Sequence, residues 1–318
     1  MAMNLNGSLC NRTELENECN RLGISAMGIA RADEVDARGQ ELYARWIADG
    51  CHGTMEYLDR YHDVRNNPKA LLPEAQSVIV TVFNYYPREK LPAEVPQFAY
   101  YAYGKDYHEV IKKRLGELTD FMSRRWGGNH RVCVDTAPLP EKYWAVRAGV
   151  GFKGKNSLLI VPEVGSFVFI GIILTTLQFD YDTPCDAHCM ECGRCIAACP
   201  NHAIRENGTI DARKCLSYLT IEYRDEIPEG TVMANNVYGC DICQKVCPHN
   251  RNCRPTTIEE FMPSPEFLSL NADRLASMAA EQFSVIFRKS AVKRTKLTGI
   301  LRNIRYLITH SEEKVMRR

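Results

Sequence analysis

The segments CMECGRCIAACP, residues 189–200, and CDICQKVCP, residues 240–248, carry seven of the 14 cysteines of this chain. The first has the spacing C-x2-C-x2-C-x3-C-P, in which three cysteines fold a short loop around one iron–sulfur cluster and the fourth binds a second cluster. The second segment lacks the first cysteine of this pattern, because Val237 stands at its position. Cys215, between the two segments, is expected to replace it.

This spacing predicts two [4Fe–4S] clusters with four cysteine ligands each. Zinc is the alternative, but zinc sites are built from CxxC pairs and have no use for the longer run that ends in Cys199-Pro200. Two neighbouring clusters form a path for electrons, so the chain is predicted to move electrons. The expected ligands are Cys189, Cys192, Cys195 and Cys247 for one cluster, with Cys185 as a substitute if Cys189 is displaced, and Cys199, Cys215, Cys240 and Cys243 for the other.

Length and composition are those of an ordinary globular protein. The chain has 318 residues, of which 45% are hydrophobic and 25% charged, and its net charge is +1. No apolar stretch precedes Cys10, and the longest apolar run, residues 167–177, is too short to cross a bilayer. We therefore expect a cytoplasmic protein with no membrane partner.

Three regions follow from the pattern along the chain. Residues 1–180 alternate predicted strands and helices, which favours an α/β domain. Residues 181–255 are rich in loops and cysteines, as in ferredoxin-like modules that are held together by their clusters, and residues 256–318 are expected to be helical. In the first region, Thr13-x-x-Glu16 has the capping-box pattern of a helix that ends near Gly23. The other expected helices are residues 35–49, 107–125 and one after Pro140, and the expected strands are residues 24–30, 77–83, 131–135, 157–161 and 167–176.

Clusters transfer single electrons, so another group must carry out bond chemistry. The chain has no GxGxxG fingerprint and no phosphate-binding loop, which argues against nicotinamide and nucleotide chemistry. Asp135 stands at the end of a predicted strand, where α/β proteins usually bind ligands. A glycine-rich stretch, residues 149–157, ends in polar side chains that suit a large ligand. The alternative is that Asp135 only caps a turn or helix and that the glycines only form tight turns.

Taken together, several stretches resemble the epoxyqueuosine reductase family, cobalamin-dependent enzymes that act on tRNA. The resemblance extends in order over residues 10–305, with both cysteine segments in place. The stretches that carry it are His52-Gly53-x-Met55-x-Tyr57-Leu58, Tyr103-Gly104-Lys105-Asp106-Tyr107-His108, Asp135-Thr-Ala-Pro, Gly154-Lys-Asn-Ser, Cys215-Leu-Ser-Tyr-Leu-Thr-Ile-Glu222, Ser290-Ala-Val-Lys-Arg294 and Leu301-Arg-Asn303.

The resemblance implies a nitroreductase-like α/β (α+β) domain that holds cobalamin, an inserted two-cluster ferredoxin-like module and a C-terminal helical segment that contacts tRNA. It also implies the reduction of epoxyqueuosine to queuosine at the wobble position of tRNA, the last step of queuosine biosynthesis, by cob(I)alamin that receives electrons through two [4Fe–4S] clusters. The implied partners are a tRNA that carries epoxyqueuosine and a low-potential electron donor, and we expect a monomer.

The family further implies roles for individual residues. Asp135 matches the proton donor, and we expect burial beside the corrin to raise its pKa, or the complex with substrate to protonate it. Tyr107 and His108 are candidates for the lining of the substrate pocket. The residues that match stretches near the cobalamin are Arg60, Lys155, Asn156 and Ser157, and Ser217 and Tyr218 are further candidates for the same surface.

Residues 288–311 contain seven basic residues and no acidic ones. A solvated helix face is one interpretation of such a run. A strip that contacts tRNA phosphates is the other, and the absence of acidic residues favours it. The candidate tRNA contacts are Lys293, Arg294 and Lys296.

Two other classes of protein are the alternatives. A corrinoid reductive dehalogenase shares the cofactor chemistry, but such enzymes usually carry a twin-arginine export signal, which we do not find in this sequence. An iron–sulfur electron-transfer protein without its own substrate would not need the large region before the clusters.

Overall fold

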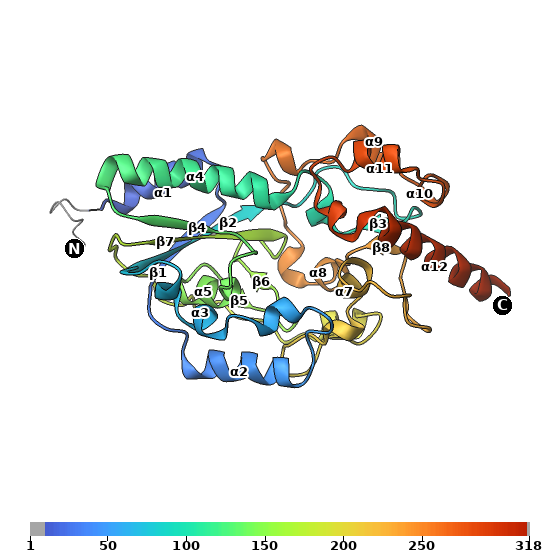
Figure 1. The fold of residues 1–318 in the computed structure, drawn as a ribbon, viewed down its shortest axis with the longest axis horizontal. Coiled ribbons are helices and arrows are strands. Elements are labelled where there is room, and N and C mark those ends of the chain that lie inside the picture. The colour runs from blue at the N-terminus through green and yellow to red at the C-terminus, as the bar shows by residue number, and fades with distance from the viewer. Residues whose placement is uncertain (1–9, 317–318) are drawn as a thin grey trace.

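A four-stranded sheet forms the centre of one half of the computed structural model, which describes residues 10–316 (Figure 1). The strand order is β1-β2-β7-β4, and every neighbouring pair is antiparallel. The connectivity is therefore α+β rather than α/β, because neighbouring strands are antiparallel and not joined as parallel strand–helix–strand units. The strands are β1 (Ala26–Arg31), β2 (Ser77–Asn84), β4 (His130–Cys133) and β7 (Val168–Thr175).

Helices cover both faces of this sheet. On one face, α1 (Arg12–Arg21) lies beside α4 (Tyr107–Trp126), and on the other face lies α5 (Glu141–Arg147) (Figure 1). Strand β2 is consequently buried along nearly its whole length, and its side chains alternate between the two layers. Ile79 and Phe83 belong to the core under α4, whereas Val78, Val80 and Val82 pack in a second core with Trp144 of α5.

The first helix begins earlier than its expected capping box. Its N-cap is Asn11, whose side-chain oxygen accepts a hydrogen bond from the backbone N–H of Glu14 over 3.2 Å. The prediction of a Thr13–Glu16 box is therefore wrong, because asparagine is at least as good an N-cap as threonine and stands closer to the start of the apolar pattern. The expected end is confirmed, since Gly23 follows the helix with a φ of 74°.

The other half of the molecule is made mostly of short helices around small strands. Strand β3 (Gln97–Phe98) pairs in parallel with β8 (Asn236–Tyr238), so a segment that precedes α4 lies beside the cysteine-rich region. Residues from 256 onward are helical, as expected. The helices are α6 (Arg194–Ala198), α7 (Leu216–Ile221), α8 (Ile242–Lys245), α9 (Pro265–Leu268), α10 (Ala272–Ala276), α11 (Ala280–Ile286) and α12 (Lys296–Met316) (Figure 1).

Elements near the expected site differ in length from their predictions. The expected strand 157–161 is reduced to β6 (Leu159–Ile160), which pairs with β5 (Phe152–Lys153). Strand β4 ends at Cys133, so Asp135 lies in the loop after the strand and not on it. Two helices, α2 (Ala37–Ala48) and α3 (His62–Asn66), lie on the α5 side of the sheet (Figure 1). Within residues 10–316, no helix combines the length and the apolar character that crossing a membrane requires.

Candidate active site and cluster sites

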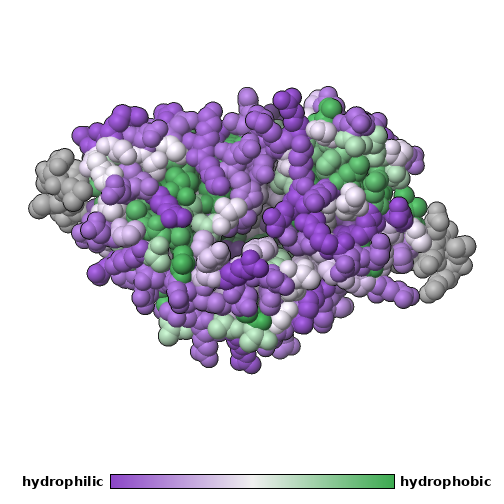
Figure 2. All heavy atoms as spheres, viewed as in Figure 1, coloured by the Kyte–Doolittle hydropathy of each residue, from purple (hydrophilic) through white to green (hydrophobic). Residues whose placement is uncertain are grey.

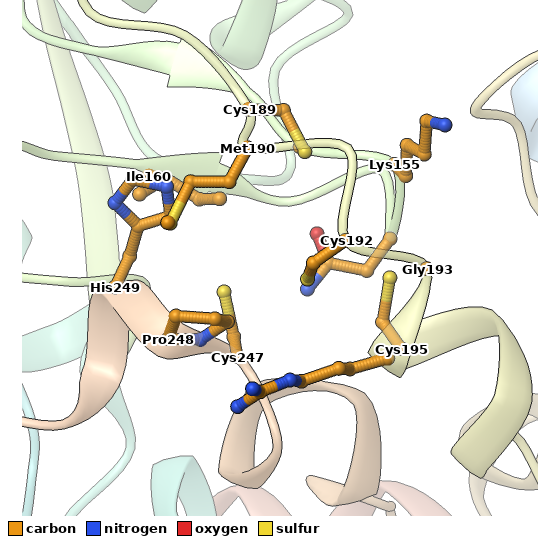
Figure 3. A pocket seen from close by; sticks show the side chains of 13 residues that line it. Lys155, Ile160, Cys189, Met190, Cys192, Gly193, Cys195, Cys247, Pro248 and His249 are labelled. Atoms are coloured by element: carbon orange, nitrogen blue, oxygen red, sulfur yellow. The ribbon is translucent and has the colours of Figure 1, made fainter.

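Four of the predicted cluster ligands surround one small cavity. Cys189, Cys192, Cys195 and Cys247 line it, and Figure 3 shows their sulfur atoms directed toward a shared space. Cys247 follows α8, while the other three lie just before α6 or in its first turn. Gly193, with a φ of 70°, allows the turn between Cys192 and Cys195. Cys185 does not line this cavity, and its Sγ faces the carbonyl oxygen of Ala187 at 3.9 Å.

The other four predicted ligands form a second group. The pKa of Cys243 lies well above its ordinary value, because burial and the neighbouring thiols Cys240, Cys215 and Cys199 all disfavour its ionised form. The pKa of Cys247 is raised by burial and by its own neighbours in the first group. The structure thus divides the eight cysteines into the two sets that the spacing predicts, and each set offers the four thiolates that a [4Fe–4S] cluster requires.

The loop of residues 154–157 lies between the cluster groups and a larger cavity. Lys155 and Asn156 line the first cysteine cavity, and Asn156 and Ser157 line the larger one. Asn156 is only 4% exposed, and its Nδ2 faces the carbonyl oxygen of Cys243 at 3.5 Å. Asn156 therefore lies next to both cluster groups, Lys155 lies beside the first group, and Ser157 lines the larger cavity.

The larger cavity measures about 600 Å³ and is lined mainly by apolar side chains of α2, α5 and the loops that flank them. We call it the cofactor cavity. Its polar lining includes Lys142 and Lys153, and Lys142 Nζ donates a hydrogen bond to the carbonyl oxygen of Ser157 over 2.9 Å. Lys142 also interacts electrostatically with Cys243, which places the second cysteine group close to this cavity.

A further cavity of about 780 Å³, which we call the substrate cavity, contacts the same region from another side. Its walls come from the segment Tyr57–Tyr61, the start of α4, the loop after β4, the end of α7 and residues 290–294. Asp135 lines both cavities, as do Leu58 and Arg65. Figure 2 shows the surface hollowed near the middle of the molecule, between its two halves.

At the junction of the two cavities, His108 bridges two carboxylates. Its Nδ1 lies 2.7 Å from Oδ1 of Asp106, and its Nε2 lies 3.1 Å from Oδ2 of Asp135. An ionised carboxylate only accepts hydrogen bonds, so both ring nitrogens must carry a proton to satisfy both contacts. Burial disfavours the charged ring, but the two aspartates outweigh it and raise the pKa of His108 to about 9. His108 is therefore an imidazolium at neutral pH.

The pKa of Asp135 is lowered in the protein without ligands. Enclosure by the cavity walls acts to raise this pKa, but the hydrogen bond and charge of His108 and a hydrogen bond from Tyr107 together lower it below its ordinary value. The side chain is also 58% exposed to the cavity space, so its burial is incomplete. In the protein without ligands, Asp135 is thus a carboxylate beside a charged histidine, and the rise expected from burial beside the corrin stays a prediction.

The carboxyl group with a raised pKa is instead Glu141, the first residue of α5. Enclosure in the wall of the cofactor cavity raises its pKa to about 8, and the nearby charge of Asp135 adds to this effect. Its Oε1 accepts a hydrogen bond from the backbone N–H of Asp135 over 2.6 Å. Sequence reasoning missed Glu141, although it lies in the stretch that contains Asp135, because nothing in the spacing shows that the loop turns back on itself.

The basic candidates lie at the rim of the substrate cavity. Lys293 and Arg294 line it, whereas Lys296 begins α12. Arg294 makes two hydrogen bonds of 2.9 Å to the carboxylate of Glu222, and its guanidinium lies 5.8 Å from the ring centre of Tyr57. Sequence reasoning did not single out Glu222 or Tyr57, because their pairing with Arg294 arises only in the folded chain.

Three other candidates are placed away from the cavities. In the part of the chain that the structure describes, Arg60, Ser217 and Tyr218 are not among the side chains that line the two large cavities. Arg60 is exposed and lies 3.6 Å from Glu56. Tyr218 is buried, and its hydroxyl group contacts the backbone N–H and the hydroxyl of Thr54, both at 2.9 Å.

The charged His108 predicts how the stability of the fold depends on pH. Because its pKa rises from 6.5 to about 9 on folding, its stabilising contribution is complete below pH 6.5 and is lost as the pH rises through about 9. Urea unfolding followed by circular dichroism at several pH values should show the free energy of unfolding of the wild type fall over this range. The free energy of unfolding of a His108→Gln variant should depend less on pH. If the free energy of unfolding changed equally with pH in the two proteins, His108 would not be the charged group that causes this dependence.

Eight cysteines in two groups, beside a large cavity with an aspartate–histidine pair, define an iron–sulfur oxidoreductase of the double-cluster type. Residues 188–250 match the 4Fe-4S double cluster binding domain, and residues 65–136 match the family described as epoxyqueuosine reductase QueG, DUF1730. The chain belongs to the epoxyqueuosine reductase family. An epoxyqueuosine reductase of Cyclobacterium marinum is 42% identical over 293 residues, which cover 90% of this chain and 93% of that protein. The Escherichia coli enzyme is 37% identical over 292 residues, 89% of this chain and 76% of that protein.

Solved structures of epoxyqueuosine reductases have the same fold. One, described as bound to an epoxyqueuosine-modified tRNA-Tyr stem loop, superposes with a TM-score of 0.85 at 29% identity, over 92% of this chain and 79% of that one. Another, from Bacillus subtilis, has a TM-score of 0.82 at 29% identity and the same coverage of both chains. The second is described as having its catalytic aspartate loop swung out of the active site.

Proposed function

We propose that the protein reduces epoxyqueuosine to queuosine at the wobble position of tRNA. The observation that carries this proposal is the position of Asp135, whose carboxylate lies where the substrate cavity and the cofactor cavity meet. Family membership supports the same reaction, because relatives that span most of this chain are epoxyqueuosine reductases and one solved relative holds the modified tRNA stem loop.

The cofactor cavity suits a large, mostly apolar ligand with polar edges such as cobalamin. Pockets for small ligands measure about 300–1,000 Å³, and two joined cavities of about 600 and 780 Å³ provide room for a macrocycle and a substrate together. Lys142, Lys153, Asn156 and Ser157 would hold its polar edge. When bound, cobalamin supplies a low-potential reductant for the epoxide. The fold that holds it is proposed to be nitroreductase-like.

The two cysteine groups would carry electrons toward this cavity. Cys192 is exposed, so the first cluster is the natural entry point for a low-potential donor. The second group is more enclosed and lies next to Lys142 in the cavity wall. We propose a cytoplasmic monomer that consists of a cofactor domain, residues 1–180, a two-cluster module, residues 181–255, and a tRNA-contacting segment, residues 256–318.

One of the two protons that convert the epoxide oxygen to water would come from the Asp135–His108 pair, and the other from solvent. Opening the C–O bond of an epoxide requires an acid at the leaving oxygen. His108 is charged at neutral pH and lies 3.1 Å from Asp135, so the pair holds a proton although the pKa of Asp135 itself is low. Tyr107, which is hydrogen-bonded to Asp135, holds the carboxylate in place. The loop of Asp135 is proposed to move in and out of the site, as in the relative from Bacillus subtilis.

Changing Lys293, Arg294 and Lys296 together to alanine is expected to weaken tRNA binding and to reduce its dependence on salt. Each phosphate contact with single-stranded nucleic acid contributes about 0.7 to the slope of log affinity against log salt, so the slope should fall by up to about 2. Fluorescence anisotropy with a labelled anticodon stem loop at several salt concentrations measures this. The matched control changes Arg38, Lys69 and Lys113, exposed cations that line neither cavity. If the two triple variants had equal slopes of log affinity against log salt, Lys293, Arg294 and Lys296 would not be tRNA phosphate contacts.

The proposed reaction is tested by anaerobic reconstitution with iron, sulfide and cobalamin, followed by mass spectrometry of nucleosides from tRNA that contains epoxyqueuosine. Queuosine that forms only when cobalamin is added is the expected result. Loading of the clusters without corrinoid binding or nucleoside conversion would refute it and favour an electron-transfer protein. Turnover of organohalides in place of tRNA would favour a reductive dehalogenase.

A further inference from the structure

Glu141 ties the loop of Asp135 to a rigid helix. The hydrogen bond of 2.6 Å from the Asp135 N–H to Glu141 Oε1 fixes a residue with a φ of 53°, in the left-handed region that side chains other than glycine seldom adopt. Glu141 itself begins α5, whose Trp144 and Ala145 are fully or almost fully buried against the sheet. The carboxyl of Glu141 thus links Asp135, whose backbone conformation is unfavourable, to a helix that is packed into the core.

The other backbone hydrogen bonds of the loop do not involve the N–H of Asp135. The N–H of Thr136 donates to the carbonyl oxygen of Val134, and the N–H of Leu139 donates to that of Ala137. At the far end of the loop, the carbonyl oxygens of Leu139 and Pro140 accept hydrogen bonds from N–H groups of α5, so these bonds attach the loop there but not at Asp135. The side chain of Asp135 reaches across to His108, which belongs to α4. Glu141 therefore holds the backbone of Asp135, and His108 holds its side chain.

We propose that Glu141 is a positioning residue that keeps the Asp135 loop turned into the active site. This inference rests on the proposed function, because it gives Asp135 its role as part of the acid. Without the Glu141 acceptor, the Asp135 N–H would lose its partner and the residue would relax toward an ordinary backbone conformation. Its carboxylate would then leave the junction of the two cavities.

The protonation of Glu141 is compatible with this role. Its enclosure raises its pKa to about 8, so the carboxyl is mostly neutral at pH 7. A neutral carboxyl still accepts a hydrogen bond through its carbonyl oxygen and does not repel the Asp135 carboxylate. The hydrogen bond itself, rather than a negative charge, is therefore the property that matters.

Variants of Glu141 test the proposal by two independent measurements. Glu141→Ala removes the acceptor oxygen, Glu141→Asp shortens the side chain that carries it, and Glu141→Gln keeps an acceptor in its amide oxygen. Glu281→Ala, at an exposed position of α11, is the control. In hydrogen–deuterium exchange of the cluster-loaded protein without cobalamin or tRNA, the peptide of residues 133–140 should exchange faster in the alanine and aspartate variants than in the glutamine variant.

In the reconstituted enzyme, the alanine and aspartate variants should lose about 10²-fold in kcat with little change in KM, as expected when a reacting group is misplaced by about an ångström. The glutamine variant should stay within about threefold of the wild type. Wild-type exchange and kcat in the alanine variant would overturn the proposal, as would a glutamine variant as impaired as alanine. If the wild type does not convert tRNA, the proposed function fails, but the exchange measurement still decides whether Glu141 holds the loop.

Discussion

Replacing Asp135 by asparagine is expected to lower kcat for queuosine formation by about 10²–10⁴-fold, the usual contribution of a positioned general acid. Asparagine has the same shape, and its amide oxygen still accepts the hydrogen bond from His108, so the structure should change little. It cannot take a proton from the imidazolium and pass it to an epoxide oxygen. Single-turnover kinetics with prereduced enzyme would isolate this step from electron delivery.

Binding measurements separate this effect from a loss of structure. The affinity for tRNA and the iron content of the Asp135→Asn variant should match those of the wild type. Asp120→Asn, at an exposed position on α4, is the matched control and should turn over normally. An Asp135→Asn enzyme with full turnover would show that Asp135 is not part of the acid.

The second large effect is expected for Cys243→Ser, which should remove one cluster and abolish turnover. Serine is a poor ligand for iron, and Cys243 lies in the more enclosed cysteine group, beside Asn156 and Lys142 of the cofactor cavity. Electrons could then no longer pass from the first cluster through the second cluster to the cofactor cavity. Iron and sulfide analysis should give about half of the wild-type content, with the electron paramagnetic resonance signal of a single reduced cluster remaining.

Cys253→Ser is the control for this experiment. Cys253 lies near Cys247, and its Sγ donates to the carbonyl oxygen of Val164 over 3.3 Å, a bond that serine retains. This variant should keep both clusters and its activity. If Cys243→Ser kept full iron content, or if Cys253→Ser lost a cluster, the division of the cysteines into ligand sets would need to be redrawn.

The cysteine groups could be predicted from the sequence because most ligands of each group lie within one short segment. The spacing between cysteines within one segment fixes the turns of one loop, and the missing cysteine at Val237 pointed to Cys215. The long elements β2 and α4 were also predictable, since a β-branched run and a helical apolar pattern determine them without knowledge of the rest of the chain.

What the sequence did not predict depends on contacts between distant segments. The contact of Asp135 with His108 spans 27 residues and lowers the pKa of Asp135 in the protein without ligands. The antiparallel order of the sheet is set by how the connections pass over it, which a strand–helix alternation does not reveal. Asn11 was missed as an N-cap because Thr13 and Glu16 fit a familiar pattern two residues later.

The cysteine cavity also constrains the order of events during synthesis of the chain. Three of its cysteines lie within residues 189–195, and the fourth, Cys247, follows the whole of the second group. A ribosome-bound chain that ends before Cys247 therefore exposes an incomplete first set, and one that ends before Cys243 cannot complete either. Because metal binding supplies folding energy to such modules, we expect cluster insertion to follow the release of this region from the ribosome and to complete its folding.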